Sequence, residues 1–415
     1  MTARTPLRPG DPLPEGWRWV RLGEIATVKS GGTPRRGNPS YWGGDIPWVK
    51  ISDITSLHVS STEETITEEG LTSSSAKLFP VGTILFTIFA TIGKVAILNI
   101  EAATNQAIAG IFNISESLDT QYLAHHLQFA GPQMANRGRG MAQDNINLTM
   151  LRSLEVLLPP LETQRRIVAW LDEAFSHLQA IKEHHAETER EAAALLPAKL
   201  AEVFGRAEKE GWRWVRLGDV VQHKTGVWGP EASSPAQGFP IVRSTEIDGL
   251  SIKPENASVR TVNVKQIENY KLQTGDILIN KSSGSPHLVG WPAIFQDPQD
   301  GRTYLFSNFM LRLRSNRTKI EPWYLLYYLH SPVARSIYLS AQATTSGLRN
   351  LRVRDFLGQL LPLPPLETQL RIVEEIEAFE EEARRIQKAQ EESRVVLEQL
   401  EKSLLAEAFR PERWV

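Results

Sequence analysis

An internal repeat constrains the fold of this chain more than any other feature of its sequence. Residues 16–23 (GWRWVRLG) recur unchanged at residues 211–218. Residues 158–164 (LPPLETQ) recur at residues 363–369, and a later peptide, LAEVF, returns as LAEAF. Self-similarity over a long period is typical of a duplicated architecture. The chain is therefore predicted to contain two copies of one plan, each a globular block followed by a shared segment.

The shared segments are predicted to form long helices that pair as a coiled coil. The proline pairs at 159–160 and 364–365 favour an extended start, because proline disfavours helix in the residue before it. Beyond each pair, apolar residues recur at alternating steps of three and four, as in coiled coils. A helix of about 40 residues would be a rod on the order of 60 Å long. The predicted seam residues are Leu171, Leu178, Ile181, Leu195, Ile376, Phe379, Ile386, Leu397, Leu400 and Leu404.

The order of the parts predicts how the helices pair. If the first helix leads to the second block and the second helix returns, the two run antiparallel and the blocks are related by a pseudo-twofold axis. Pro197 lies inside the first helix and is expected to kink or end it near its last turns. Residues 412–415 (ERWV) resemble residues 213–215 (RWV) at the start of the second block. We therefore expect the C-terminal tail to pack beside the first block.

The predicted fold class is α+β, with two mixed α/β domains separated by two long helices in an antiparallel coiled coil. A chain of 415 residues is too long for one ordinary core, which agrees with this division. The predicted parts are the first block (1–160), the first helix (161–205), the second block (206–365), the second helix (366–410) and the tail (411–415).

The charge of the chain permits binding to nucleic acid but does not establish it. The formal net charge is −2, which alone does not favour a polyanionic partner. The charge is unevenly distributed, because residues 206–365 carry +7 whereas residues 366–415 carry −5. Affinity for phosphate depends on the local face of the protein and not on its total charge.

Several classes of function are disfavoured by what the sequence lacks. Cysteine is absent, which excludes disulfides and thiolate metal sites and fits a reducing cytoplasm. Residues 81–98 are apolar but hold glycines, threonines and Lys94, so we interpret them as buried strands and not as a membrane span. His184 and His185 have no histidine counterparts in the second copy, so no metal is expected there. The motifs of nucleotide-binding loops, zinc proteases, serine hydrolases, adenine methyltransferases and nucleases are missing, so no catalytic site is predicted.

Several short motifs in this order resemble those of a known family. Residues 30–34 (SGGTP) precede residues 41–49 (YWGGDIPWV). Residues 92–94 (IGK) and 105–106 (NQ) follow, and both long helices begin with LPPLETQ. With this duplicated arrangement the chain resembles, along nearly its whole length, the specificity (S) subunits of type I restriction–modification systems. The second block departs from the pattern, because residues 224–230 (KTGVWGP) replace the SGGTP loop.

The resemblance implies a function and a set of partners. Each block would be a target-recognition domain that reads one half of a split site in double-stranded DNA. The helices would act as a spacer and as the dock for two methyltransferase subunits, which methylate adenine with S-adenosylmethionine. Motor-nuclease subunits would join for restriction. The chain itself would hold no cofactor and no catalytic residue, and would act in the cytoplasm.

In the first block, two loops offer side chains suited to DNA. Glycines in residues 29–36 would let the backbone approach the duplex, and arginines there would hold phosphate or guanine; the alternative is a hairpin turn with solvated charges. Residues 137–147 offer arginine for guanine and amides for adenine, or else form an ordinary capped turn. The candidate contacts are Lys29, Ser30, Gly31, Gly32, Thr33, Arg35, Arg36, Lys50, Thr91, Lys94, Arg137, Arg139, Gln143, Asn145 and Asn147.

In the second block, residues 281–285 form a hydroxyl-rich glycine loop after a predicted strand and are a candidate phosphate cradle. Residues 344–350 correspond to the loop before the first helix. The candidate contacts are Lys224, Thr225, Arg243, Lys281, Ser282, Ser283, Ser285, Thr345, Ser346, Arg349 and Asn350.

The tryptophans are interpreted as packing residues. Trp42 and Trp48 are expected to pack under the glycine loop of the first block. The tryptophans of the repeated octapeptide alternate as in a strand and are expected to pack in the core or between domains; they are Trp17, Trp19, Trp212 and Trp214.

Two rival hypotheses remain beside DNA recognition. A self-sufficient modification enzyme or nuclease would bind S-adenosylmethionine or cleave DNA alone. A coiled-coil scaffold with two protein-binding heads would show no preference for DNA sequence. The repeat favours the DNA reader, because its helices are alike while its blocks differ.

Overall fold

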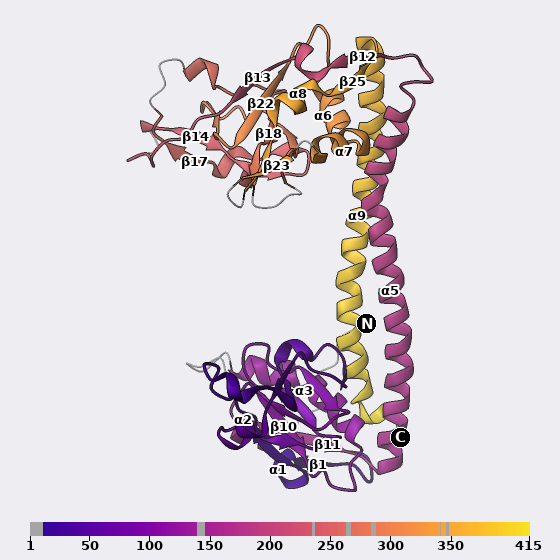
Figure 1. Ribbon diagram of the computed structural model, residues 1–415. Helices are drawn as coiled ribbons and strands as arrows, with labels where there is room; N and C mark the ends of the chain where they lie inside the picture. The colour runs from indigo at the N-terminus through magenta and orange to yellow at the C-terminus, as the bar shows by residue number, and fades with distance from the viewer. Residues whose placement is uncertain are drawn as a thin grey trace. The chain divides into compact units, whose positions relative to one another are not determined.

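The computed structural model divides the chain into two compact units, which are described separately (Figure 1). Unit 1 is Met1–Ala186 with Glu392–Val415, and unit 2 is Glu187–Glu391. Each unit includes one block and the adjoining parts of both long helices. The described residues are 11–138, 146–234, 237–262, 267–283, 288–340, 342–345 and 348–415, and for 135–138, 340, 342–345 and 348 the description is limited to the backbone.

The block of unit 1 is built around a five-stranded sheet. Its strands, in spatial order, are β2 (Thr27–Ser30), β10 (Ile108–Phe112), β7 (Ile84–Thr87), β8 (Val95–Leu98) and β4 (His58–Val59). Every residue of β7 and β8 is buried, so the apolar run in this part of the sequence forms paired strands, as predicted.

Both faces of this sheet are covered. Ile84 and Phe86 pack in one cluster with residues of α3 (Thr120–Gly138). Leu85 points to the opposite face, where it packs with Val49 and Phe79. A second sheet supplies that opposite layer, in the order β5 (Glu64–Ile66), β3 (Trp42–Val49), β9 (Ala102–Thr104) and β6 (Leu78–Phe79). Short helices complete the block: α1 (Leu22–Ile25), α2 (Glu68–Thr72) and α4 (Leu148–Arg152).

Unit 2 repeats this plan with more strands. Its largest sheet has the order β13 (Val221–Thr225), β22 (Met310–Ser315), β18 (Ile277–Asn280), β20 (Pro292–Ile294), β16 (Ser251–Ile252) and β15 (Ile247–Asp248). Two three-stranded sheets are β17 (Ser258–Arg260), β14 (Phe239–Val242), β21 (Leu305–Phe306), and β19 (Ser282–Ser283), β24 (Leu348–Leu351), β23 (Gln342–Thr345). The block helices are α6 (Pro322–His330), α7 (Pro332–Ser340) and α8 (Val353–Gly358).

The two repeated peptides of each copy pair with one another. In unit 1, β1 (Arg18–Arg21) pairs antiparallel with β11 (Glu155–Leu158). In unit 2, β12 (Arg213–Arg216) pairs with β25 (Leu360–Leu363) in the same way. The octapeptide and the heptapeptide therefore form one two-stranded ladder at the start of each long helix.

The tryptophans of this ladder are only partly as predicted. Trp17 and Trp212 are buried and Trp19 is half-buried, which confirms their packing role. Trp214 is 40% exposed, so the prediction of a core position for it is wrong. It lies in a two-stranded ladder, which leaves side chains on one face open to solvent.

A buried glutamine in each repeat ties its block to the long helix. The Gln164 side chain donates to the carbonyls of Ser117 and Pro159, at 3.0 and 2.9 Å, and accepts from the Asp119 amide at 2.8 Å. Gln369 makes the equivalent three bonds, to the carbonyls of Lys319 and Pro364 and the amide of Glu321. Both glutamines are fully buried, where unmade hydrogen bonds would be costly. This role explains the glutamine of the LPPLETQ repeat, which sequence reasoning had not assigned.

The long helices α5 (Leu161–Gly205) and α9 (Leu366–Ala408) pair antiparallel, as predicted. In unit 1, Lys182 Nζ lies 2.5 Å from a Glu401 oxygen, and the rings of Trp170 and Trp414 lie 6.1 Å apart. In unit 2, Arg206 lies 2.9 Å from Glu375. Within unit 1, moving along α5 from Trp170 to Lys182 changes the contacted residue from Trp414 to Glu401, which comes earlier in the chain. The two segments therefore run in opposite directions. None of the described helices combines the length and apolarity needed to cross a membrane.

Burial along the predicted seam is uneven. Leu171, Leu178 and Ile376 are buried, as expected. The other seam residues are half-buried or exposed; they are Leu195, Phe379, Leu397 and Leu404, which are half-buried, and Ile181, Ile386 and Leu400, which are 49%, 37% and 38% exposed. The prediction of a continuous buried seam is therefore wrong for the last three. A pair of helices covers only a narrow stripe, and the seam gains full burial mainly where a block packs against it.

The structure tests two further predictions, the effect of Pro197 on α5 and the position of the C-terminal tail. Helix α5 continues through Pro197 to Gly205, so proline does not end it. The turns after Pro197 are held by burial of Leu200 and Phe204 in the core of unit 2. The C-terminal tail packs against the core cluster of unit 1, as predicted, because Trp414 is half-buried beside it. Just before the tail, Phe409 stacks on Phe129, with 5.3 Å between ring centres.

Candidate nucleic-acid interface

The glycine loop of unit 1 follows β2 and is packed tightly against the block. Gly31 and Gly32 donate to the carbonyls of Ile108 and Thr104, at 3.0 and 2.8 Å. A Cβ atom on Gly31 would lie 2.0 Å from Thr104 Oγ1, and one on Gly32 would lie 2.3 Å from the Ser75 carbonyl carbon. The glycines are therefore required by close packing inside the block. Both glycines are buried, so this packing accounts for them without the predicted approach of their backbone to DNA, which stays a prediction.

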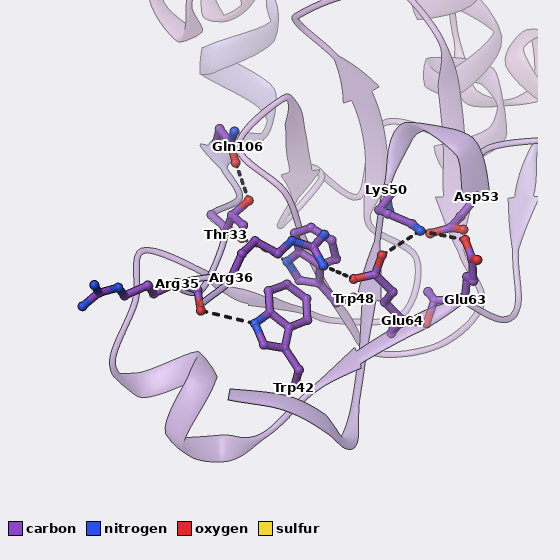
Figure 2. Close-up of polar contacts among 12 residues, drawn as sticks. Thr33, Arg35, Arg36, Trp42, Trp48, Lys50, Asp53, Glu63, Glu64 and Gln106 are labelled. Carbon is purple, nitrogen blue, oxygen red and sulfur yellow. Dashed lines mark hydrogen bonds and ion pairs between the residues drawn. The ribbon is translucent and has the colours of Figure 1, made fainter. Parts of the chain in front are cut away.

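Two tryptophans support this loop from below, as predicted (Figure 2). Trp48 Nε1 donates to the Gly32 carbonyl at 3.0 Å, and Trp42 Nε1 donates to the Arg35 carbonyl at 3.4 Å. The two indole rings meet edge to face with their centres 5.0 Å apart. The backbone of the loop is thus fixed at two points.

Arg36 and Lys50 belong to one ion-pair network. Arg36 pairs with Glu64, and Lys50 Nζ lies 2.8 Å from Glu64 and 2.7 Å from Glu63 (Figure 2). The hydrogen bond from Arg36, with a further one from Lys50, lowers the pKa of the Glu64 carboxyl. Hydrogen bonds to Glu63 and Glu64 raise the pKa of Lys50. Two cations and two carboxylates balance here, so neither predicted DNA contact presents an uncompensated charge.

The remaining candidates of this loop are more open. Arg35 is exposed, and its side chain has no hydrogen bond or ion pair with any residue in the described part of the chain. Thr33 donates to the Gln106 side chain. Lys29 is exposed with its ammonium 5.6 Å from the ring centre of Phe112, and Ser30 is half-buried.

A second loop of unit 1, which holds Thr91 and Lys94, lies close to the glycine loop. Ile88 at its start donates to the Ala107 carbonyl at 2.8 Å, next to the Gln106 that contacts Thr33. Thr91 and Lys94 are exposed, and Lys94 Nζ also donates to a backbone carbonyl of the block at 3.2 Å. The structure thus brings together two segments that lie about 60 residues apart in the sequence.

The loop before α5 is described only at its end. Asn147 caps α4, since its side-chain oxygen accepts from the Met150 amide at 2.8 Å. The alternative of an ordinary capped turn therefore holds for this residue. The other candidates that lie outside the described residues or side chains are Arg137, Arg139, Gln143, Asn145, Ser285, Thr345 and Ser346.

In unit 2, the structure joins two candidate segments that were predicted separately. Ser282 and Ser283 form β19, which pairs with β24 at Asn350 and Arg349. Ser282 also donates to the Asn350 side chain. Lys281 precedes β19, and burial lowers the pKa of its ammonium. Hydroxyl, amide and guanidinium groups thus lie on adjacent strands, an arrangement suited to phosphate and base edges.

The other candidates of unit 2 are partly engaged within the protein. Lys224 lies over the ring of Tyr270, with its ammonium 4.7 Å from the ring centre, and Thr225 follows it on β13. Arg243 is paired with Glu246 at 3.0 Å, so its charge is compensated.

Comparison with known proteins identifies the family of this chain. A family model described as "Type I restriction modification DNA specificity domain" matches residues 14–190 and 209–394. The chain belongs to the type I restriction–modification specificity family. The match covers both copies of the repeat, which confirms the resemblance read from the motifs.

Individual relatives of this specificity family span nearly the same length. The MjaIX specificity subunit of Methanocaldococcus jannaschii is 25% identical over 378 residues, which cover 85% of this chain and 84% of that protein. The EcoKI specificity subunit of Escherichia coli K12 is 22% identical over 418 residues, which cover 96% and 90%.

Two solved structures have the same specificity-subunit fold. The HsdS subunit of Thermoanaerobacter tengcongensis is 27% identical, with a TM-score of 0.53 over 97% of this chain and 98% of that one. A chain solved for the complex assembly and conformational transition of the type I R-M system has a TM-score of 0.71 at 24% identity, over 96% and 99%. The latter is a likeness of fold alone.

Some residues of the specificity-subunit interface were missed by sequence reasoning. Glu63 and Glu64 compensate two predicted contacts, and they lie just before and at the start of β5, where the sequence has no motif. In unit 2, Arg260 lies over the ring of Trp228 at 4.7 Å. Trp228, which lies inside a glycine-containing loop, could have indicated such a contact. The sequence did not show that the cation would be Arg260 of β17, which is distant in the chain. No group of three or more His, Asp or Glu side chains in the described part of the chain could hold a metal ion.

Proposed function

We propose that this chain is the DNA-reading subunit of a type I restriction–modification complex and that it reads a bipartite target. Unit 1 reads one half-site and unit 2 reads the other. The observation that carries this proposal is that both units share the same structural elements at the long helices but differ in the sequence of the loop proposed to meet DNA. The ladder and the buried glutamine are the same in both units. The loop after the first block strand is SGGTP in one copy and TGVWGP in the other.

The chemistry of recognition follows from the side chains at these loops. Phosphate contacts by lysine, arginine and hydroxyl groups would hold the register, and arginine or amide contacts to base edges would specify sequence. We propose that catalysis belongs to partner subunits, with S-adenosylmethionine bound by a methyltransferase and not by this chain. The absence of cysteine fits action on DNA in a reducing cytoplasm.

The long helices are the proposed dock for two methyltransferase subunits, through which motor-nuclease subunits would join. Large apolar side chains are exposed along α9; Val395 and Val396 are 42% and 61% exposed. They lie in a helix that is otherwise strongly charged. Exposed apolar groups rimmed by charge are typical of a protein interface.

Each unit also has a cavity where its block meets the helices. The cavity of unit 2 has a volume of about 670 Å³ and is lined by Leu200 and Leu250 among others. The cavity of unit 1 has a volume of about 730 Å³ and is lined by Leu405 and Leu57, which occupy the corresponding places in the repeat. A partner that binds twice, once to each unit, would meet similar surfaces in both places.

The test of the proposed function is to map methylated adenine in the DNA of a host that carries the partner methyltransferase gene, with and without this chain. We expect methylation at a two-part target with an unread gap only when this chain is present. Methylation or cleavage of DNA by the chain alone would favour the rival of a self-sufficient enzyme. An unaltered methylation map would favour the scaffold.

A change at the exposed face of α9 should weaken docking. Val396→Glu places a charge where an apolar group would be buried by the partner, so affinity for the methyltransferase should fall by about 10- to 100-fold. Calorimetric titration of the full chain with the methyltransferase measures this. Val81→Glu is the matched control, because Val81 is 60% exposed in the turn between β6 and β7 and lines neither of these two cavities. An equal loss of affinity in both variants would show that the methyltransferase does not bind at this face of α9.

A further inference from the structure

Two adjacent arginines in the glycine loop of unit 1 lie in opposite environments. The Arg36 guanidinium carbon lies 4.0 Å from the ring centre of Trp42 and 4.8 Å from that of Trp48. Its Nη1 also pairs with Glu64. A guanidinium over aromatic faces gains cation–π attraction, and the carboxylate fixes its orientation. Arg36 is thus held on two sides by its own protein (Figure 2).

Arg35 has a fixed backbone and an open side chain. Its carbonyl accepts from Trp42 Nε1 at 3.4 Å and from the Asn38 amide at 3.1 Å. Its side chain is directed away from the tryptophans and carboxylates, as Figure 2 shows. Within the described residues, no carboxylate pairs with it. Arg35 therefore carries a full positive charge on an anchored backbone.

The local charge balance separates the two residues further. Arg36 and Lys50 are balanced by Glu63 and Glu64, so an approaching phosphate would meet a neutral cluster there. A phosphate near Arg35 would meet one uncompensated cation. The nearby carboxylates of Glu63 and Glu64 would repel a phosphate that approached Arg36, whereas no carboxylate is paired with Arg35 among the described residues.

We propose that Arg35 is the cation of this loop that contacts DNA, and that Arg36 is a positioning residue that holds Arg35 outward. This inference rests on the proposed function. Because Arg36 is drawn inward by the tryptophans and Glu64, the neighbouring side chain is left on the outer side of the loop. The sequence predicted the same role for both arginines, whereas this proposal makes Arg35 the DNA contact and Arg36 the residue that positions it.

Unit 2 anchors its corresponding loop in a related way. There the loop supplies the aromatic group, Trp228, and strand β17 supplies the cation, Arg260, at 4.7 Å from the ring centre. Arg260 also lies 3.9 Å from Glu231. The loop after the first block strand is thus fixed by a cation on an aromatic ring in both units, with the partners exchanged. This supports anchoring as the function of Arg36.

The salt dependence of DNA binding tests whether Arg35 is the DNA contact and Arg36 the positioning residue. We would measure binding of the full chain with its methyltransferase subunits to target DNA over a series of salt concentrations. Removal of a phosphate contact lowers the slope of log K against log salt by about one. Arg35→Ala is expected to lower this slope by about one and to weaken binding by about tenfold or more. Arg36→Ala is expected to weaken binding but to leave the slope unchanged.

Two further variants keep the test independent of folding. Arg36→Lys retains the charge but loses the planar group that stacks on the two tryptophans, so it should behave like Arg36→Ala. Glu64→Gln removes an ion-pair partner of both Arg36 and Lys50, so Glu63→Gln, which removes a partner of Lys50 alone, is measured beside it. If Arg36 were itself the contact, Glu64→Gln would strengthen binding more than Glu63→Gln does; we expect Glu64→Gln to weaken binding. Lys209→Ala, which removes an exposed cation in the turn between α5 and β12, is the control and should change neither affinity nor slope.

The outcomes separate this inference from the proposed function. A wild-type complex with no preference for its target over unrelated DNA would overturn the proposed function. Target preference with an unchanged slope in Arg35→Ala would overturn the inference alone. A slope lowered by Arg36→Ala and restored by Arg36→Lys would also overturn it, because charge at Arg36 would then be the group that DNA meets.

Discussion

Replacing Asp276 with alanine is expected to destabilise unit 2 by about 3–5 kcal/mol, because it leaves a partly buried cation without its partner. Asp276 is 1% exposed and binds Arg314 through both oxygens, each at 2.7 Å. The same carboxylate accepts from the Gln273 amide at 2.8 Å. Arg312, whose pKa is lowered by burial, lies two residues from Arg314 on β22.

The repeat provides a matched double variant for this prediction. Unit 1 has Thr83 and Phe112 at the places where unit 2 has Asp276 and Arg314. Asp276→Thr with Arg314→Phe removes both charges together, and it should recover most of the stability lost in Asp276→Ala. Asp248→Ala breaks an exposed ion pair with Lys253 and should change stability far less.

Hydrogen exchange in a series of urea concentrations would measure these effects unit by unit. Peptides from β18 and β22 should lose protection in Asp276→Ala, whereas peptides from β7 and β10 serve as the internal reference. Equal protection in Asp276→Ala and the wild type would show that the ion pair contributes nothing to unit 2.

Exchange of the first block for that of another family member is expected to replace one half-site and leave the other unchanged. Specific DNA complexes are typically about 10³-fold or more tighter than non-specific ones, so the new half-site should be preferred by a factor of that order. The physical reason is that each block has its own sheets, and the ladder and glutamine that join it to the long helix are repeated in both units. Methylation mapping of the exchanged protein measures the result.

The tertiary structure adds a condition to this exchange. Leu405 of α9 and Phe409, which follows α9, are buried in the core of unit 1, where Phe409 contacts Tyr122 and Phe129 of the block. Trp414 of the tail is half-buried against the same cluster. A donor block that carries residues 1–155 alone would therefore meet a mismatched tail. We expect exchange of residues 1–155 together with residues 405–415 to give the more stable protein.

Change in both half-sites after this exchange would contradict independent reading by the two units. The reciprocal exchange of residues 206–360 is the control, and it should alter only the half-site that the first exchange leaves intact. A protein that is stable but reads neither half-site would show that recognition depends on contacts between the donor and host parts.

The long helices were predictable because their pattern is local and repeated. Apolar steps of three and four mark a helix face without knowledge of its partner, and the duplication placed both helices in one register. The antiparallel sense followed from the order of the parts. The degree of burial could not be predicted from the pattern, because Ile181 and Leu178 both fit it, yet Ile181 is 49% exposed and Leu178 only 3%. The difference depends on which block packs over the helix.

The candidate DNA contacts were predictable as segments but not as individual side chains. Composition indicates that a loop with glycine, threonine and arginine can meet DNA. It does not indicate that Gly31 is needed to pass Thr104, or that Arg36 faces Glu64. Those contacts join residues on separate strands, and no local pattern marks them.

The sequence by itself determined the duplication, the two long helices, their pairing and the membership of a DNA-reading family, because each depends on repetition, periodicity or contiguous motifs. Tertiary structure alone decided which charges are compensated, why the repeated glutamine is needed, and how deeply each residue of the helix seam is buried. The physical reason is that compensation and burial depend on distances between residues far apart in the chain. Only the folded backbone sets those distances.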